Sequence, residues 1–152
     1  MADEREAGQG AGASAIVRVA RGWIGTPYHH QASLKGVGTD CLGLVRGVWR
    51  EIHGRDAELP PAYSRDWAEA SGRETMLEAA RRHLDEITVA EAEAGDVLIF
   101  RLRPGTVAKH AGILATAGTM IHAMEGRPVA EVPLGPWWRR RIAAAFRVRG
   151  AG

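Results

Sequence analysis

Apolar residues recur at helical spacing at the start of the ordered part of the chain. The pattern covers residues 13–24, and the Gly25-Thr26-Pro27 sequence that follows is a strong stop signal for a helix. We therefore expect a helix that ends at Trp23 or Ile24. Residues 25–38 contain glycines suited to irregular backbone, and they are expected to form a loop.

Two further segments carry the same periodicity. Over residues 40–53 the apolar positions fall on one stripe, with Thr39 as the expected amino-terminal cap and Gly54 as the carboxy-terminal cap. Residues 66–84 repeat the pattern with an interruption at residues 71–72. The first half of the chain is thus expected to supply amphipathic helices.

After Gly95 the periodicity changes to short apolar stretches separated by glycine and proline. The stretches are residues 97–100, 111–115, 120–124, 129–132 and 143–148. Their length and their apolar and β-branched residues predict strands. Helices followed by a succession of strands indicate an α+β fold with N-terminal helices packed on an antiparallel β-sheet, because a parallel sheet would alternate strands with helices.

The length of 152 residues suits one compact domain, which we assign to residues 13–152. Residues 1–12 are rich in glycine, alanine and charge without an apolar period, and they are expected to form a flexible or docking arm. Apolar residues make up 45% of the chain and charged residues 25%, a composition that excludes general disorder and permits a packed core.

Charge and cysteine content exclude several functional classes. A single cysteine, Cys41, excludes an intramolecular disulfide and a zinc site built from several thiolates. The formal charge of +2 gives no indication of nucleic-acid binding. No apolar run is long enough to insert into a membrane, and the acidic start resembles no export signal. We therefore expect a protein that is made in the cytoplasm without a signal peptide.

Cys41 is the first candidate for chemistry. It stands at the start of the helix expected over residues 40–53, where unpaired backbone N–H groups favour an anion. We therefore expect a stabilised thiolate, the nucleophilic form of cysteine. The alternative is a small buried apolar side chain, the commoner fate of a lone cysteine.

Two histidines lie in or next to consecutive predicted strands. If residues 116–118 form the turn between them, His110 faces Met124, and His122 lies two residues from that partner on the same face. The two imidazoles then become diagonal neighbours within reach of each other. A register shifted by one residue would place them on opposite faces.

Together these residues match nucleophilic acyl transfer. Cys41 would attack a carbonyl, His110 would act as general base and His122 would orient His110. A zinc site formed by His29, His30, His110 and His122 is an alternative, although no helical pair of metal-ligand histidines is present. The expected site therefore contains no metal and needs no cofactor.

An aromatic and basic run, residues 137–141, stands apart from these residues. It could stack on nucleic-acid bases, but no matching basic stripe exists elsewhere. We interpret it as a surface corner in which tryptophan packs inward and arginine faces solvent, with partner docking left open.

Five motifs in order resemble a known family. They are Gly25-Thr26-Pro27-Tyr28, Asp40-Cys41-Leu42-Gly43-Leu44-Val45, Gly95-Asp96-Val97-Leu98-Ile99-Phe100, His110-Ala111-Gly112-Ile113-Leu114 and Ile121-His122-Ala123. Their order and spacing resemble the NlpC-type cysteine peptidases, papain-like enzymes that cut peptidoglycan stem peptides. The resemblance covers residues 13–148. The sequence after Tyr28 is similar to a subset from phage tails and gene transfer agents.

The resemblance implies roles for individual residues. Cys41 aligns with the family's nucleophile, His110 with its general base and His122 with the polar residue that orients the base. Tyr28 matches the tyrosine beside the oxyanion site, and Asp40 matches the acid that helps to hold the substrate's free amine. The family commonly has serine after the nucleophile, where this chain has leucine, which leaves the amine contact and the need for a free stem amino terminus open.

We therefore expect a cysteine endopeptidase or amidase that hydrolyses peptide bonds in bacterial peptidoglycan. The resemblance further implies a virion component that breaches the cell wall, with other tail or baseplate proteins as partners and the periplasmic wall as its place of action. Two alternatives remain: a catalytically silent tail-tip or assembly protein with the same fold, and an acyltransferase acting on lipid or amine acceptors.

Overall fold

The computed structural model describes residues 4–57 and 72–150. The helices are α1 (Glu4–Arg21), α2 (Cys41–His53), α4 (Thr75–His83), α5 (Pro136–Arg139) and the 3-10 helix η1 (Val89–Glu91). The main sheet contains β3 (Asp85–Ile87), β4 (Val97–Phe100), β5 (His110–Thr116), β6 (Thr119–His122), β7 (Ala130–Pro133) and β8 (Ile142–Arg147). A short hairpin pairs β1 (Ser33–Leu34) with β2 (Gly38–Thr39).

The main sheet has the strand order β3-β8-β4-β5-β6-β7, and all its pairings are antiparallel. The predicted α+β class with an antiparallel sheet is confirmed. All five strands expected after Gly95 are present within two residues of their predicted bounds. The edge strand β3 was not predicted, because its short sequence Asp85-Glu86-Ile87 has too few apolar residues to show strand periodicity.

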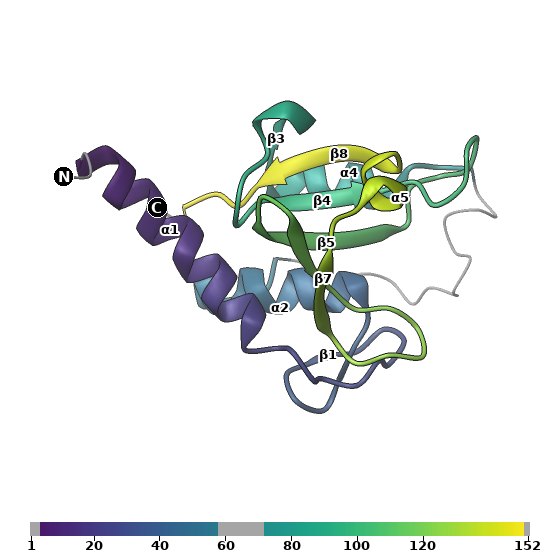
Figure 1. The fold of residues 1–152 in the computed structure, drawn as a ribbon. Helices are drawn as coiled ribbons and strands as arrows, with labels where there is room; N and C mark the ends of the chain where they lie inside the picture. The colour runs from purple at the N-terminus through teal and green to yellow at the C-terminus, as the bar shows by residue number, and fades with distance from the viewer. Residues whose placement is uncertain (1–3, 58–71, 151–152) are drawn as a thin grey trace.

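Helix α1 differs from its prediction at both ends. Its backbone is helical from Glu4, so residues 4–12, expected to be an arm, continue the helix. The helix ends at Arg21, and residues 22–25 form turns in which the N–H groups of Trp23 and Ile24 donate to carbonyls three residues earlier. In Figure 1 the amino-terminal turns of α1 extend beyond the sheet. Docking by this segment remains a prediction.

Helix α2 follows its predicted bounds closely. Its amino-terminal cap is Asp40, whose side chain accepts a hydrogen bond from the N–H of Gly43 at 2.7 Å. The prediction of Thr39 as the cap was wrong by one residue, because Thr39 belongs to β2. Gly54 ends the helix in the left-handed conformation, with φ of 76°, as expected.

The helix predicted over residues 66–84 is present in part. Helix α4 begins at Thr75, after a turn in which Gly72 has φ of 71°. The prediction for residues 66–71 lies outside the described residues. Met76, Leu77 and Ala80 are buried on the side of α4 that faces the core.

The core forms on both faces of the sheet. On one face α1, α2 and α4 pack over alternate residues of the central strands, including Ile99 and Ile113. A smaller cluster covers the other face around Leu98 and Phe100 and includes the partly buried Trp138 of α5. Figure 1 shows α2 crossing below β5 and α5 beside the opposite side of the sheet.

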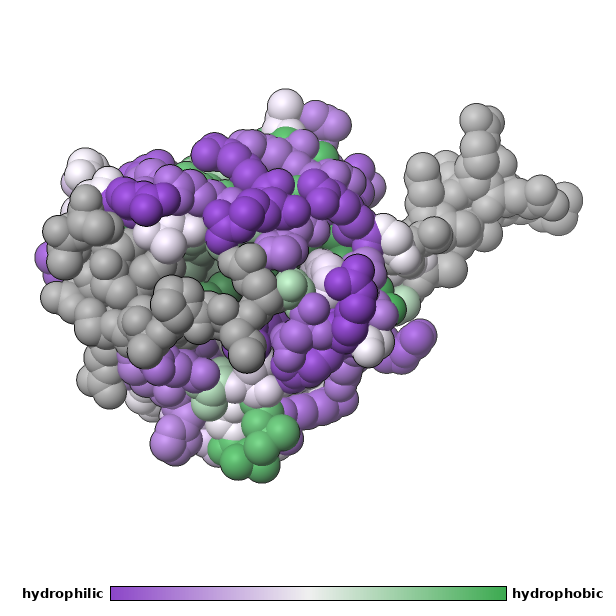
Figure 2. Space-filling view, turned by 180° about the vertical axis from the view of Figure 1, so that it is seen from behind, coloured by the Kyte–Doolittle hydropathy of each residue, from purple (hydrophilic) through white to green (hydrophobic). Residues whose placement is uncertain are grey.

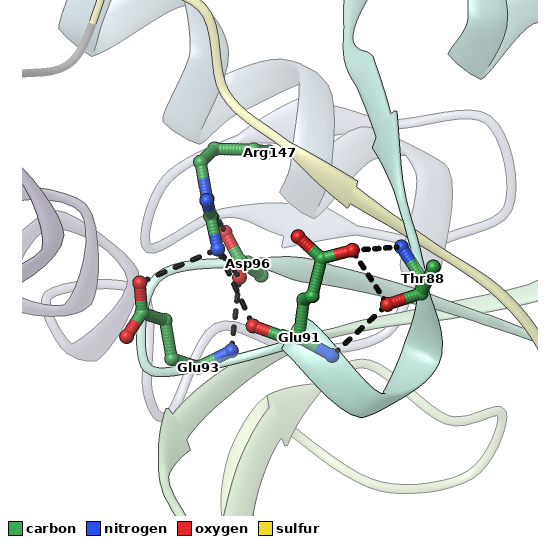
Figure 3. A network of polar contacts seen from close by, with 5 residues as sticks. All are labelled: Thr88, Glu91, Glu93, Asp96 and Arg147. Carbon is green, nitrogen blue, oxygen red and sulfur yellow. Dashed lines mark hydrogen bonds and ion pairs between the residues drawn. The ribbon is translucent and has the colours of Figure 1, made fainter.

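A network of hydrogen bonds and ion pairs connects β8 to the turn before β4 (Figure 3). The guanidinium of Arg147 donates to both carboxylate oxygens of Asp96, at 3.0 and 2.9 Å, and Asp96 is 3% exposed. Asp96 also accepts from the N–H of Glu93 at 2.9 Å. Beside it, Thr88 and Glu91 form a capping box around η1.

The surface is mainly hydrophilic on the face seen in Figure 2, with a hydrophobic projection at the bottom. This is the position of the β1–β2 hairpin, where Leu34 and Val37 are 59% and 63% exposed. Within the described part of the chain, no helix has the length and apolar character needed to cross a membrane.

Candidate active site

Cys41 is the first residue of α2, as predicted, and its side chain is half-buried. The loop over residues 28–32 and β2 place it there: Tyr28 forms a parallel β-bridge with Thr39, and the N–H of Asp40 donates to Ala32. The thiol donates to the carbonyl of Lys109 at 3.8 Å. The sulfur therefore lies at the residue that precedes His110.

The resting thiol is protonated, contrary to the sequence-based expectation of a stabilised thiolate. Burial, together with the negative charge of Asp40, raises the pKa of Cys41 to about 12. Backbone N–H groups of Ala111, Leu42 and Cys41 itself oppose this effect without cancelling it. The expectation was wrong because it counted the N–H groups at the helix start but not burial and the adjacent carboxylate.

The two histidines lie together as the sequence predicted. Ile113 pairs with Ile121, which is the expected register, even though a bulge beyond Leu114 makes the turn one residue shorter than expected. His110 Nε2 and His122 Nδ1 are 2.9 Å apart, a hydrogen-bonded distance. The predicted pairing of the two imidazoles on one face is confirmed.

Both imidazoles are buried and uncharged at neutral pH. Burial and, to a smaller extent, the neighbouring His122 together lower the pKa of His110 to about 3. Burial lowers the pKa of His122 to about 4. The two side chains are 6% and 5% exposed. A neutral imidazole retains one unprotonated nitrogen, so either ring can accept a proton.

The hydrogen bond between the rings fixes which nitrogen of His110 is available for chemistry. If His110 is the base, Nδ1 must be unprotonated, and Nε2 then carries the hydrogen and donates to His122 Nδ1. This assignment makes His122 the acceptor that holds the His110 ring in place. Nδ1 of His110 is left to receive a proton from the thiol.

Thiol and imidazoles reach the site from different sides of the sheet. Cys41 belongs to α2 and packs against the helix-covered core, whereas the rings of His110 and His122 contact Trp138 on the opposite face. The link between them is the amino-terminal end of β5, where Lys109, which accepts the thiol hydrogen bond, directly precedes His110. Among the described residues, neither imidazole is hydrogen-bonded to the Cys41 sulfur, so the thiol must turn from Lys109 before it can donate to His110.

Trp138 is a site residue that sequence reasoning did not assign. Its ring stacks on His110 with centroids 5.4 Å apart and meets His122 edge-on at 5.2 Å. Phe100 contacts both Trp138 and His110. The expectation that tryptophan packs inward at residues 137–141 holds for Trp138, while Trp137 is 47% exposed. The ring shields the histidine pair from water and contributes to their burial.

Asp40 connects the loop before α2 to the start of the helix. Its two carboxylate oxygens accept from the N–H groups of Gln31, at 2.8 Å, and Gly43, at 2.7 Å. Gln31 has φ of 66°, a left-handed conformation that costs energy for a residue other than glycine. The carboxylate therefore stabilises a strained loop beside Cys41, a positioning role that the sequence did not suggest.

Gly43 allows this loop to approach the helix. A side-chain carbon there would overlap the carbonyl oxygen of Ala32 and lie 2.7 Å from Thr39 Oγ1. Ser33 Oγ donates to the carbonyl of Gly43 at 2.7 Å. A small residue at this position is therefore required for the geometry around Cys41. Tyr28, in the same loop, is half-buried and packs against the same core cluster as Cys41.

The alternative zinc site is not assembled among the residues that the structure describes. Over residues 4–57 and 72–150, no three histidine, cysteine, aspartate or glutamate side chains gather as a group that could hold a metal ion. His29 is exposed in the loop before α2, whereas His110 and His122 are buried under Trp138. The thiol of Cys41 lies against Lys109, at the strand end that carries the hydrogen-bonded pair of His110 and His122.

Two curated relatives share sequence with most of this chain. A gamma-DL-glutamyl hydrolase of Bacillus subtilis is 28% identical over 133 residues, which are 87% of this chain and 28% of the relative. Tail tip assembly protein K of Escherichia phage N15 is 25% identical over 114 residues, which are 72% of this chain and 45% of the relative. The chain thus spans less than half the length of both relatives.

Solved structures share the fold. The NlpC/p60 domain of the peptidoglycan hydrolase SagA is 26% identical with a TM-score of 0.65, and the match covers 90% of this chain and 98% of that domain. The peptidoglycan hydrolase RipB from Mycobacterium tuberculosis is 21% identical with a TM-score of 0.58, covering 96% of this chain and 68% of that one.

A family profile covers the site and nearly all of the sheet. Residues 25–147 match the NlpC/P60 family, a range that contains Cys41, His110 and His122. The fold, the relatives and this match agree. The chain belongs to the NlpC/P60 family, whose members are cysteine peptidases and amidases that hydrolyse peptidoglycan.

Proposed function

We propose that this chain is a cysteine peptidase that hydrolyses amide bonds in peptidoglycan stem peptides. The observation that carries the proposal is the 2.9 Å contact between His110 and His122 at the strand end where the Cys41 thiol lies. A buried pair of imidazoles beside a thiol at a helix start supplies a nucleophile, a base and an orienting group.

In the first step the Cys41 thiol turns from the carbonyl of Lys109 and gives its proton to Nδ1 of His110. The sulfur forms a bond with the substrate's carbonyl carbon, and the electron pair of the C=O bond moves to oxygen. When the C–N bond breaks, the leaving amine takes the proton from His110, and an acyl group remains on sulfur. Throughout this step Nδ1 of His122 accepts a hydrogen bond from the Nε2–H group of His110 and stabilises the imidazolium that forms transiently on His110.

In the second step water replaces the amine. His110 takes a proton from the water, whose oxygen attacks the acyl carbon, and the C–S bond breaks with return of the proton to sulfur. The burial of both imidazoles keeps the base neutral between turnovers. In both steps the thiol, the imidazole of His110 and water account for every bond and proton that moves.

Tyr28 and Asp40 complete the proposed site. We assign Tyr28 to the oxyanion side, since its backbone bridge to Thr39 places it next to the helix start that carries Cys41. Asp40 holds the loop in position and adds negative charge near the substrate's amine. The family resemblance implies a serine at the position of Leu42, so recognition of a free stem amino terminus would rest on the carboxylate without a neighbouring hydroxyl.

The relatives support this substrate class. One is named for the hydrolysis of glutamyl bonds, and two structures of similar fold belong to peptidoglycan hydrolases. The phage relative, named as a tail tip assembly protein, supports action as part of a phage tail particle with other tail proteins as partners. In that case the tail particle would bring the chain to the cell wall. A gene transfer agent particle and baseplate partners rest on the sequence resemblance alone.

The same phage relative favours a second candidate function. A tail-tip protein can keep this fold for assembly alone, with a site that no longer turns over substrate. The two functions differ in one property, which is hydrolysis by the isolated chain.

Mass spectrometry of wall fragments separates them. Purified peptidoglycan is incubated with the chain, and the soluble products are weighed. The enzyme proposal predicts stem-peptide fragments, each pair heavier by one water than the parent, and their masses identify the bond. An unchanged wall after prolonged incubation with folded protein would favour the assembly function.

A further inference from the structure

An arginine-lined pocket lies beside the proposed active site. Arg101, Arg103, Arg140 and Arg141 surround a hollow of about 370 Å³, with an apolar floor that includes Ile142. No acidic side chain of the described residues lines this hollow. Its volume falls within the range of small-molecule sites, about 300–1,000 Å³. The pocket therefore combines positive charge with room for a single chemical group.

Two of the four arginines already have partners that fix them. Arg101 is paired with Glu74 and donates to the carbonyl of Thr106 at 2.8 Å. The guanidinium of Arg141 donates to the carbonyl of Trp137 at 2.7 Å and lies 3.8 Å from the centroid of that ring. These contacts make the walls rigid. They also neutralise Arg101, since Glu74 is a carboxylate.

The other two arginines have no carboxylate partner among the described residues. Arg103 and Arg140 are exposed, and neither forms an ion pair within that part of the chain. Elsewhere on the surface, arginines such as Arg81 and Arg149 are paired with acidic residues. Unpaired guanidinium groups beside a hollow are well suited to bind a carboxylate from outside, because their planar donors match its two oxygens.

The pocket connects to the site through two short segments. Arg103 lies in the loop that leads from β4 to His110, and Arg140 directly follows α5, whose Trp138 stacks on His110. Figure 1 shows α5 beside the end of the sheet where this loop turns into β5. A peptide bound across the catalytic residues would have this pocket next to one of its ends.

We propose that the pocket binds a free carboxylate of the peptide substrate, with Arg103 and Arg140 as the groups that recognise it. The inference rests on the proposed function, and it adds a specificity site to that function. A substrate whose carboxylate is converted to a carboxamide would lose the charge that these two arginines match. The chain would therefore prefer stem peptides with a free carboxyl end.

Titration calorimetry tests the proposal without turnover. The Cys41→Ala chain, which cannot form an acyl intermediate, is titrated with a wall tetrapeptide that has a free terminal carboxylate and with its carboxamide. We expect the carboxylate to bind about tenfold more tightly, as for one charge-assisted contact at a partly exposed site. In the Arg103→Gln, Arg140→Gln double variant the preference should fall below about twofold. The matched control is Arg18→Gln, an exposed arginine on α1.

Equal affinity for the two peptides, or a preference that survives the double substitution, would overturn the pocket assignment. The pocket assignment would also be overturned if the double variant bound a polyglycerol phosphate chain more weakly but bound both peptides as before. The two arginines would then recognise an anionic polymer. The proposed function fails separately, when the unsubstituted chain releases no fragments from the wall.

Discussion

In the histidine pair, the hydrogen bond at Nε2 of His110 determines which nitrogen of that ring can act as the base. Nε2 of His110 is occupied by Nδ1 of His122, so the proton that leaves the thiol must go to Nδ1 of His110. His122 acts through His110 in this scheme and needs only to accept a hydrogen bond. The two histidines should therefore respond differently to substitution.

We predict that His122→Gln retains more activity than His122→Ala. The glutamine carbonyl can accept from Nε2 of His110, whereas alanine frees the ring to rotate, so kcat should fall about tenfold for glutamine and about a hundredfold for alanine. His110→Asn should lose about 10²–10⁴-fold, the usual contribution of a general base. Rates of stem-peptide release, with circular dichroism to verify folding, measure these effects. If activity survived in His110→Asn and not in His122→Gln, the two roles would be reversed.

Burial of the histidines also makes folding stability depend on pH. The pKa of His122 is lowered to about 4 in the folded chain, below its value of about 6.5 when unfolded. As pH falls, the unfolded chain takes up protons first. The stability from a neutral His122 is therefore complete above about pH 6.5 and is lost as pH falls toward 4.

We predict that His122→Gln weakens this dependence. Between pH 7 and pH 5 the free energy of unfolding of the unsubstituted chain should fall by about 2 kcal/mol more than that of the variant, since glutamine does not titrate. Urea unfolding at the two pH values gives the comparison, in which titrating groups other than the neighbouring His110 cancel between the two chains. Parallel pH dependences would show that His122 is not held neutral by the fold.

At the scale of elements, the start of α2 depends on close contact with the preceding loop. We predict that Gly43→Ala displaces this loop, because the added methyl would overlap the carbonyl of Ala32. The change should cost about 1–3 kcal/mol of stability and should lower kcat/KM, since the loop positions Cys41. Gly118→Ala is the control, as open space surrounds that position. Equal effects of the two substitutions on kcat/KM would show that the loop before α2 does not position Cys41 for catalysis.

Elements with complete local signals could be predicted from the sequence. Helix α2 has an apolar stripe and a glycine stop, and its bounds were predicted within one residue. The start of α1 was not, because Gly8, Gly10 and Gly12 are weak helix formers. Strand β3 was missed because it is short and polar, and its pairing with β8 defines it.

Site features that follow from the pairing register of two neighbouring strands could be predicted from the sequence. Features that depend on packing between distant elements could not. The pairing of β5 with β6 follows from the turn, so the neighbouring imidazoles could be inferred. The role of Trp138 could not, because only the packing of α5 on the sheet brings its ring over His110. The raised pKa of Cys41 likewise depends on burial that no local pattern encodes.

At the scale of the whole molecule, the ion pair of Asp96 and Arg147 connects β8 to the turn before β4. We predict that Asp96→Asn destabilises the chain by about 2–3 kcal/mol, because it breaks a buried pair whose guanidinium is partly exposed. Glu93→Gln, which weakens a more exposed pair with the same arginine, should cost below about 1 kcal/mol. Urea unfolding measures both changes. A larger loss for Glu93→Gln would contradict the importance given to burial.

Comparison of the unsubstituted chain with Cys41→Ala shows whether Cys41 carries the acyl group during hydrolysis. Release of stem-peptide fragments from purified peptidoglycan is followed for the unsubstituted chain and for the variant at equal concentrations of folded protein. Covalent catalysis by Cys41 predicts steady release by the first and none above background by the second, since only the thiol can carry the acyl group. Comparable release of fragments by both chains would contradict covalent catalysis by Cys41, because the amide bond would then be cut in the absence of the thiol.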